Sequence, residues 1–84
     1  MVAHKDSHRE LRVIALEIEQ DWKKPYFGAI PYLKAMGVVD KITDDYFADS
    51  AESVVLYFLA NANTWRGEIA RRIKGELNAM CGRE

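Results

Sequence analysis

The chain has 84 residues and a mass of 9.6 kDa, which is enough for one small domain. Twelve basic and thirteen acidic residues give a net charge of −1, which excludes a polybasic protein that coats nucleic acid. The single cysteine, Cys81, excludes an internal disulfide, so the fold depends on its core. Because so small a core leaves a narrow margin of stability, we expect a homodimer.

The sequence gives no sign of targeting or of membrane insertion. Its start, MVAHKDSHRE, contains no apolar run that a secretory signal would need. The longest apolar run, residues 54–60, is much shorter than the roughly 20 residues of a membrane span. We therefore expect a cytoplasmic protein with no membrane contact, folded as one helical domain over residues 1–84 with a flexible segment at 1–7.

The first predicted element is a helix over residues 8–23. Ser7 and Glu10 have the spacing of a capping box, in which each side chain bonds the other residue's backbone N–H. Val13 and Leu16 widen the apolar stripe that follows. Its main members recur at helical spacing: Leu11, Ile14, Ala15, Ile18 and Trp22.

Two prolines interrupt the chain after this helix. Pro25 and Pro31 disfavour helical backbone at the residues before them. Pro31 suits the first position of a short helix that ends at Met36, with Gly37 as a left-handed cap. A kinked helix over residues 26–36 is the alternative.

The middle of the chain contains a short turn and then a strongly apolar segment. Thr43, Asp44 and Asp45 are suited to cap a single helical turn that carries Tyr46 and Phe47. Residues 49–52 have the capping-box spacing again, with Asp49 before Glu52. The run at 54–59 is β-branched and aromatic enough for a buried strand. We predict a helix instead, because a cap precedes it and no second strand is available for pairing.

The last predicted helix covers residues 65–80. Residues 61–64 are typical of a short turn, with Asn63 or Thr64 as the cap. One unbroken helix of about thirty residues through this segment is the alternative. Trp65, Ile69, Ile73 and Leu77 recur every four residues and are expected to face the core. The fold class is therefore all-α, a small bundle of three main helices plus one short or kinked helix.

The sequence contains no pattern of an enzyme or of a cofactor site. Phosphate-binding, nucleophile-elbow and zinc-protease motifs are absent. Acidic residues gather between residues 40 and 52, but acids before a helix are favoured by its dipole and by capping. We therefore expect neither catalysis nor a bound metal or cofactor.

Nucleic-acid binding is the alternative function. A turn followed by helix 65–80 is similar to a helix-turn-helix arrangement, and its candidate contacts are Arg66, Arg71, Arg72 and Lys74. Residues 66–84 have a net charge of only +2, however, whereas a protein that reads DNA neutralises several phosphates. Nucleic acid is therefore not the expected partner.

The aromatic residues near the two prolines and the middle turn favour a protein-binding surface. Tyrosine is enriched where a surface is both apolar and wet. The candidate interface residues are Tyr26, Phe27, Tyr32, Tyr46 and Phe47. The partner would be a second copy of the chain or a different protein.

Two long segments resemble small proteins of actinobacteriophages, of the mycobacteriophage type and of unassigned function. They are WKKPYFGAIPYL at 22–33 and VVLYFLANA at 54–62, the second followed by TWRGE at 64–68. The resemblance covers most of the chain after the first ten residues, and it carries no catalytic residue. It implies a phage origin, expression in a bacterial host cytoplasm, and a role in host takeover or lysogeny. From the aromatic residues and the absence of catalytic ones, we expect a small protein-interaction or regulatory module that acts through self-association or a host protein.

Overall fold

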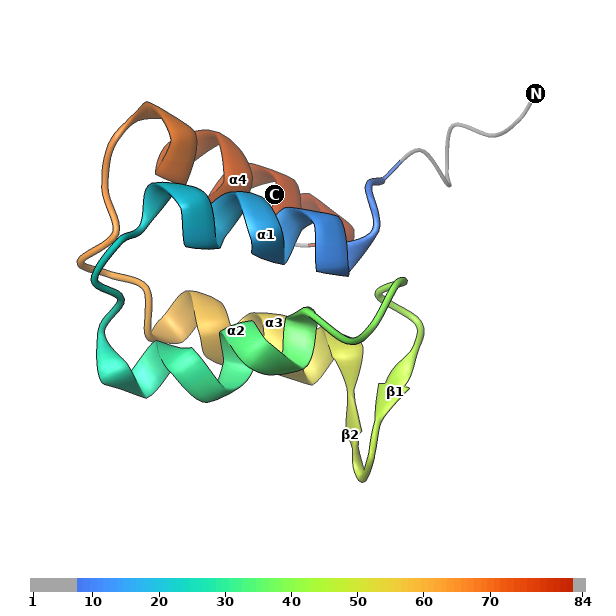
Figure 1. Cartoon of the computed structure of the whole chain (residues 1–84). Helices are drawn as coiled ribbons and strands as arrows, with labels where there is room; N and C mark the ends of the chain where they lie inside the picture. The colour runs from blue at the N-terminus through green and yellow to red at the C-terminus, as the bar shows by residue number, and fades with distance from the viewer. Residues whose placement is uncertain (1–7, 83–84) are drawn as a thin grey trace.

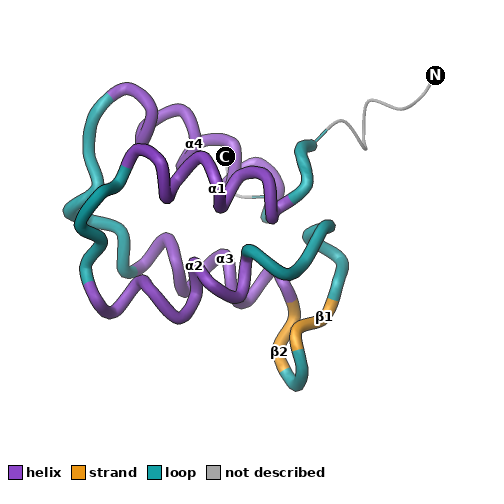
Figure 2. Tube along the Cα trace, in the orientation of Figure 1, coloured by secondary structure: helices purple, strands orange, loops and turns teal. Residues whose placement is uncertain are grey.

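Four α-helices form two layers in the structure, a computed structural model that describes residues 8–82. Helix α1 (Leu11–Asp21) lies beside α4 (Glu68–Met80), and α2 (Ile30–Met36) lies beside α3 (Ala51–Ala60) (Figure 1). Successive helices run in opposite directions, as in an up-down bundle. A small hairpin of β1 (Asp45–Tyr46) and β2 (Asp49–Ser50) precedes α3 and projects from the α2–α3 layer (Figure 2).

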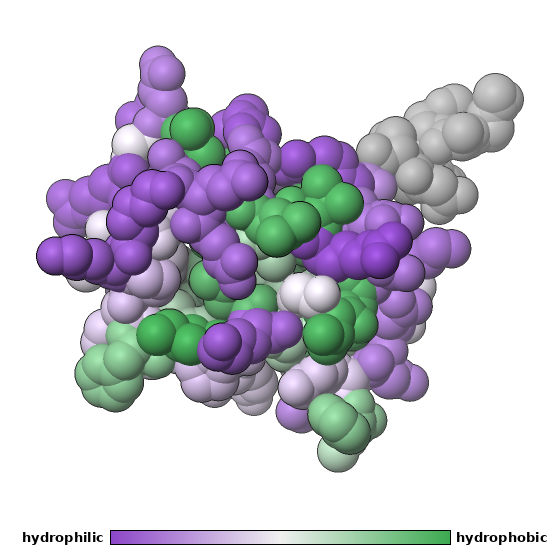
Figure 3. Space-filling model, in the orientation of Figure 1, coloured by the Kyte–Doolittle hydropathy of each residue, from purple (hydrophilic) through white to green (hydrophobic). Residues whose placement is uncertain are grey.

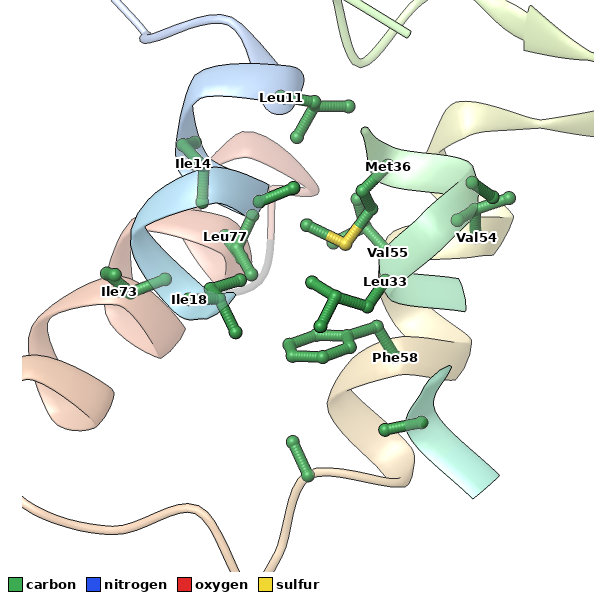
Figure 4. Close-up of a cluster of buried hydrophobic side chains, with 14 of the residues drawn as sticks. Leu11, Ile14, Ile18, Leu33, Met36, Val54, Val55, Phe58, Ile73 and Leu77 are labelled. Atoms are coloured by element: carbon green, nitrogen blue, oxygen red, sulfur yellow. The ribbon is translucent and has the colours of Figure 1, made fainter. Parts of the chain in front are cut away.

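The core lies between the two layers (Figure 4). Side chains of α1 and α4 point toward those of α2 and α3, and Phe58 is the largest of the fully buried ones. Within residues 8–82, every buried side-chain nitrogen or oxygen has a hydrogen-bond partner. The predicted class is confirmed in its coarse form, since the described chain is mostly helical with one short helix, but the hairpin means that it is not strictly all-α.

Helix α1 begins later than predicted. Glu10 is its N-cap, with extended backbone, and makes no side-chain cap bond, so the assignment of Glu10 to the first helical turn is wrong. Ser7, the other half of that capping box, lies outside the described residues. The backbone N–H of Leu11 donates to the carbonyl of Asp40 at 2.8 Å instead. A distant loop therefore satisfies one of the backbone donors at the start of α1.

The prediction that Val13 and Leu16 widen the buried stripe of α1 is also wrong. Leu16 is 58% exposed and Val13 is 43% exposed, whereas the main stripe is buried. Both positions lie on the helix surface away from that stripe, which already fills the space against the other helices.

Helix α2 begins one residue before the predicted short helix, because Ile30 has helical backbone although it precedes Pro31; the predicted start at Pro31 is therefore wrong. A 3-10 turn, η2 (Phe27–Ala29), leads directly into α2, and Pro31 lies in the first turn of α2. The prediction for Gly37 is wrong, because its φ of −71° is ordinary right-handed backbone.

The segment after α2 folds as a hairpin, so the predicted helical turn with Tyr46 and Phe47 is wrong. Asp45 pairs with Ser50 and Tyr46 with Asp49, which leaves a loop of Phe47 and Ala48. The carboxylate of Asp44 accepts hydrogen bonds from the backbone N–H groups of Asp40 and Lys41, at 3.0 and 2.9 Å, and closes the turn before β1. These bonds lower the pKa of Asp44, that from Lys41 most strongly.

Helix α3 confirms that the apolar run is helical rather than a strand, but its cap lies one residue later than predicted. The Ser50 hydroxyl, not the Asp49 carboxylate, accepts from the Ser53 N–H at 3.1 Å. Glu52 lies in the first turn, where the helix dipole favours an acid.

The break between the last two helices is confirmed, but α4 begins three residues later than predicted. Its N-cap is Gly67, with a φ of 116°, and neither Asn63 nor Thr64 caps it. Trp65 therefore lies outside the helix, although it is buried as expected. The later start makes Ala70 a core residue and leaves Ile69 38% exposed, which contradicts the predicted stripe.

Candidate protein-interaction surface

The five predicted interface aromatics form contacts in pairs rather than one cluster. The rings of Tyr46 and Phe47 lie 4.8 Å apart between centroids, and those of Tyr26 and Phe27 lie 4.9 Å apart. Tyr32 pairs at 5.4 Å with Tyr57, a residue of α3 that sequence reasoning did not select. Each pair lies on the α2–α3 layer or on the segments that enter it.

Phe47 is the most exposed large apolar residue of the described chain. Its side chain is 90% exposed at the first position of the two-residue hairpin loop. Its φ of 55° makes it the one non-glycine residue within 8–82 that has left-handed backbone. The hairpin extends away from α1 and α4, so the tip stands clear of the other layer (Figure 1).

Tyr26 and Phe27 lie at the start of the η2–α2 segment and are 45% and 77% exposed. Gly28 allows this arrangement, because a Cβ there would lie 2.5 Å from Cε2 of the Tyr26 ring. The same ring borders an open depression of about 320 Å³ whose other walls belong to the end of α3 and the following loop: Ala60, Asn61, Asn63 and Thr64.

The two exposed pairs lie at opposite ends of α2. Phe27 precedes that helix, whereas the hairpin follows it and leads into the antiparallel α3. One 3-10 turn and seven α-helical residues span about 16 Å, so one small contact patch does not include both pairs. Tyr32, half-buried against Tyr57, contributes to the α2–α3 packing between them.

Exposed aliphatic residues that the sequence analysis did not select as interface residues lie on α1 and just after α2. Val13, Leu16 and Val38 are exposed, and Val38 reaches 68%. Figure 3 shows apolar side chains on the face where α1 and α2 lie in front, separated by hydrophilic ones. The helical positions of Val13 and Leu16, outside the main stripe, are the signal that could have identified them.

The basic residues of the DNA-binding alternative are partly engaged inside the fold. Arg72 donates to Glu17 of α1, which also pairs with Arg9 at 2.9 Å. Arg9 in turn holds Glu76 of α4 by two hydrogen bonds, of 2.9 and 2.8 Å. The hydrogen bonds from Arg72 and then Arg9 lower the pKa of Glu17. Arg72 therefore belongs to a network that joins α1 to α4.

Lys74 is also engaged, because it binds the loop before its own helix. Its Nζ donates to the carbonyls of Ala62 and Trp65, at 2.7 and 2.6 Å, and lies 5.8 Å from the centre of the Trp65 ring. Burial, more than the charge of Arg66, lowers the pKa of Lys74. Of the four predicted DNA contacts, Arg66 and Arg71 are exposed and form no ion pair within residues 8–82. Binding of DNA stays a prediction that these contacts do not favour.

Residues 8–82 contain no group of three or more His, Cys, Asp or Glu side chains arranged to hold a metal ion. Among the same residues, no helix is both long and apolar enough to cross a membrane. Compared with protein-family models, with curated proteins and with solved structures, the chain matches none. The resemblance to phage proteins stays a prediction.

Proposed function

We propose that this chain is a small protein-interaction module whose main contact element is the β1–β2 hairpin, with Phe47 at its tip. The observation that carries the proposal is the combination of left-handed backbone and 90% exposure at Phe47. Left-handed backbone costs an L-residue about 1–2 kcal/mol, and a ring in solvent does little to offset that cost.

Folding alone favours a different residue at this position. Two-residue hairpin loops with positive φ at the first position favour glycine, and asparagine or aspartate also tolerate left-handed backbone. Phe47 therefore lowers the stability of the isolated domain. Such strain is common where a residue serves binding, and buried aromatic side chains dominate many protein interfaces.

Phe27 offers a second aromatic contact at the other end of α2. A second copy of the chain and a different protein are both possible occupants of these aromatic residues. The resemblance to phage proteins favours a protein of a bacterial host. The proposal includes no catalysis, no cofactor and no nucleic acid.

A comparison of captured proteins tests the proposal. Wild type, Phe47→Gly and Ile69→Ala are immobilised at equal density and exposed to a lysate of the cells in which the chain is naturally expressed. Phe47→Gly removes the ring and accepts the backbone, and Ile69→Ala removes an exposed apolar group from α4. We expect a protein retained by wild type and Ile69→Ala and lost by Phe47→Gly. Equal retention by all three would contradict the proposal.

A further inference from the structure

Helix α1 presents an exposed apolar centre with a positive residue at one end and a negative residue at the other. Arg12, Val13, Leu16 and Glu19 border one open depression of about 430 Å³, together with Ala15 and Gly37. Leu16, the middle residue of α1, is 58% exposed. Ala15 belongs to the buried core-facing stripe of α1, but Val13 and Leu16 lie outside that stripe and are exposed, so this face of α1 is only partly covered within the chain.

The order of these residues along α1 matches a twofold symmetry. Arg12 and Glu19 are seven residues apart, which is two helical turns and about 10 Å. Leu16 lies half a residue from their midpoint. A twofold axis through that point would run a second α1 antiparallel to the first. It would bring Leu16 of the two copies together and place Arg12 of each copy opposite Glu19 of the other.

We propose that a second copy of this chain docks on this face, forming an antiparallel α1–α1 contact. The inference rests on the self-association part of the proposed function, but assigns it to α1 and not to the aromatic residues. Charge complementarity points to a second copy as the occupant, because one face carries both Arg12 and Glu19, although Glu10 and Asp40 already neutralise part of the charge at the Arg12 end. Val38, exposed just after Gly37 at the edge of the depression, adds apolar surface.

Arg12 has donors to spare for such a pair. Its contacts within the chain, to Glu10 at 3.1 Å and to Asp40 at 3.0 Å, both use Nε. The guanidinium carries four further N–H donors on its terminal nitrogens. The side chain is 57% exposed, so a second carboxylate has access to it.

The contact is small, so the dimer is weak. Interfaces below about 1,200 Å² of total buried area are typical of transient complexes, and we expect a dissociation constant of roughly 10–1,000 μM. Sedimentation measurements must therefore extend to about 1 mM protein.

Complementary charge reversals test the proposal. In Arg12→Glu both ends of the face carry acids. In Glu19→Arg each end carries an arginine, with Glu10 and Asp40 still beside Arg12. We expect each variant alone to raise the dissociation constant about tenfold, as two attractive pairs become repulsive. In an equimolar mixture every ion pair has opposite charges again, so a heterodimer of wild-type affinity should form. Arg71→Glu, the same charge change on α4, should leave association unchanged.

Two further variants keep the test decisive. Leu16→Gln should weaken the dimer without a charge change, and it serves where Arg12→Glu folds poorly beside Glu10 and Asp40. Phe47→Gly should leave the dimer intact. A wild type that stays monomeric to 1 mM, or a mixture that fails to associate, overturns the inference. Dissociation by Phe47→Gly would move the dimer contact to the hairpin. Capture of a different protein through Phe47 is measured separately, so the two proposals fail independently.

Discussion

Replacing Phe47 by glycine should stabilise the isolated domain, although it removes the largest exposed ring of the described chain. Glycine adopts positive φ without a steric penalty, and the ring at this position is 90% exposed. The variant therefore removes conformational strain and loses little buried surface.

The magnitude follows from two opposing terms. Relief of left-handed backbone is worth about 1 kcal/mol once the greater freedom of glycine in the unfolded chain is included. Loss of the contact with the Tyr46 ring costs about 0.5 kcal/mol, at the low end for an aromatic pair. The net change is a stabilisation of about 0.5 kcal/mol. In a domain of this size that raises the melting temperature by about 2–4 °C.

Phe47→Ala is the matched control, because it removes the same ring but retains Cβ and its strain. We expect Phe47→Ala to be less stable than Phe47→Gly by about 1 kcal/mol, measured by urea unfolding followed by circular dichroism. Equal stability of the two variants would show that φ at this position carries no strain. A loss above about 2 kcal/mol in both would show that the ring belongs to the folding core. Either result would refute the reasoning.

The remaining predictions concern the core, the loop and the ion pairs. Trp65→Ala should lower the free energy of unfolding by about 3–5 kcal/mol, a large part of the total stability of a small domain, because the Trp65 indole stacks on Trp22 at 5.7 Å. Trp22 fluorescence during urea unfolding measures this loss. A loss below about 1 kcal/mol would contradict the core position of Trp65. Lys74→Met should lower the free energy of unfolding by about 2 kcal/mol, because the carbonyls of Ala62 and Trp65 lose a charged hydrogen-bond donor. Amide hydrogen exchange in residues 61–67 should become faster at the same time. Because the pKa of Glu17 is lowered in the folded state, its ion pairs stabilise the fold fully above about its usual value of 4.5, and this stabilisation is lost as the pH falls below that value. Glu17→Gln should therefore make the free energy of unfolding fall less steeply with pH in acid. An equally steep fall in wild type and Glu17→Gln would show that Glu17 is not the cause. A gel shift at low salt should show no complex with duplex DNA, and a clear complex would revive the role of helix α4 in nucleic-acid binding.

Local patterns predicted those elements that local interactions determine. The helical spacing from Leu11 to Ile18 gave a helix whose observed bounds lie inside the predicted ones. The apolar run before Ala60 and the polar break after it were also assigned correctly, although none of the predicted caps (Asp49, Asn63 and Thr64) is the observed one.

Elements that depend on distant contacts were not predictable from those patterns. The hairpin lacks the glycine or asparagine by which such loops are recognised, and Phe47 occupies the position instead. The late start of α4 places Trp65 in the core beside Trp22, with its indole N–H donating to Asp21 at 2.8 Å. No spacing rule anticipates a contact between segments so far apart along the chain.

The candidate surface shows the same division. Segments that interrupt helices were expected to expose aromatic residues, and Phe27 and Phe47 lie in solvent. Tyr32 was grouped with them, but it packs on Tyr57, which requires the α2–α3 pairing. Lys74 resembled a free surface cation until the fold placed two loop carbonyls against its ammonium group.

The most direct test of the central claim is photo-cross-linking from the hairpin tip. A chain with a photoreactive phenylalanine analogue at position 47 is irradiated in lysate of the native cells, with or without an excess of unlabelled protein. We expect a discrete cross-linked protein that unlabelled wild type competes away and unlabelled Phe47→Gly does not. The mass of the cross-linked product distinguishes a second copy from a different partner. No cross-link, or equal competition by wild type and Phe47→Gly, would contradict the claim that Phe47 forms the contact.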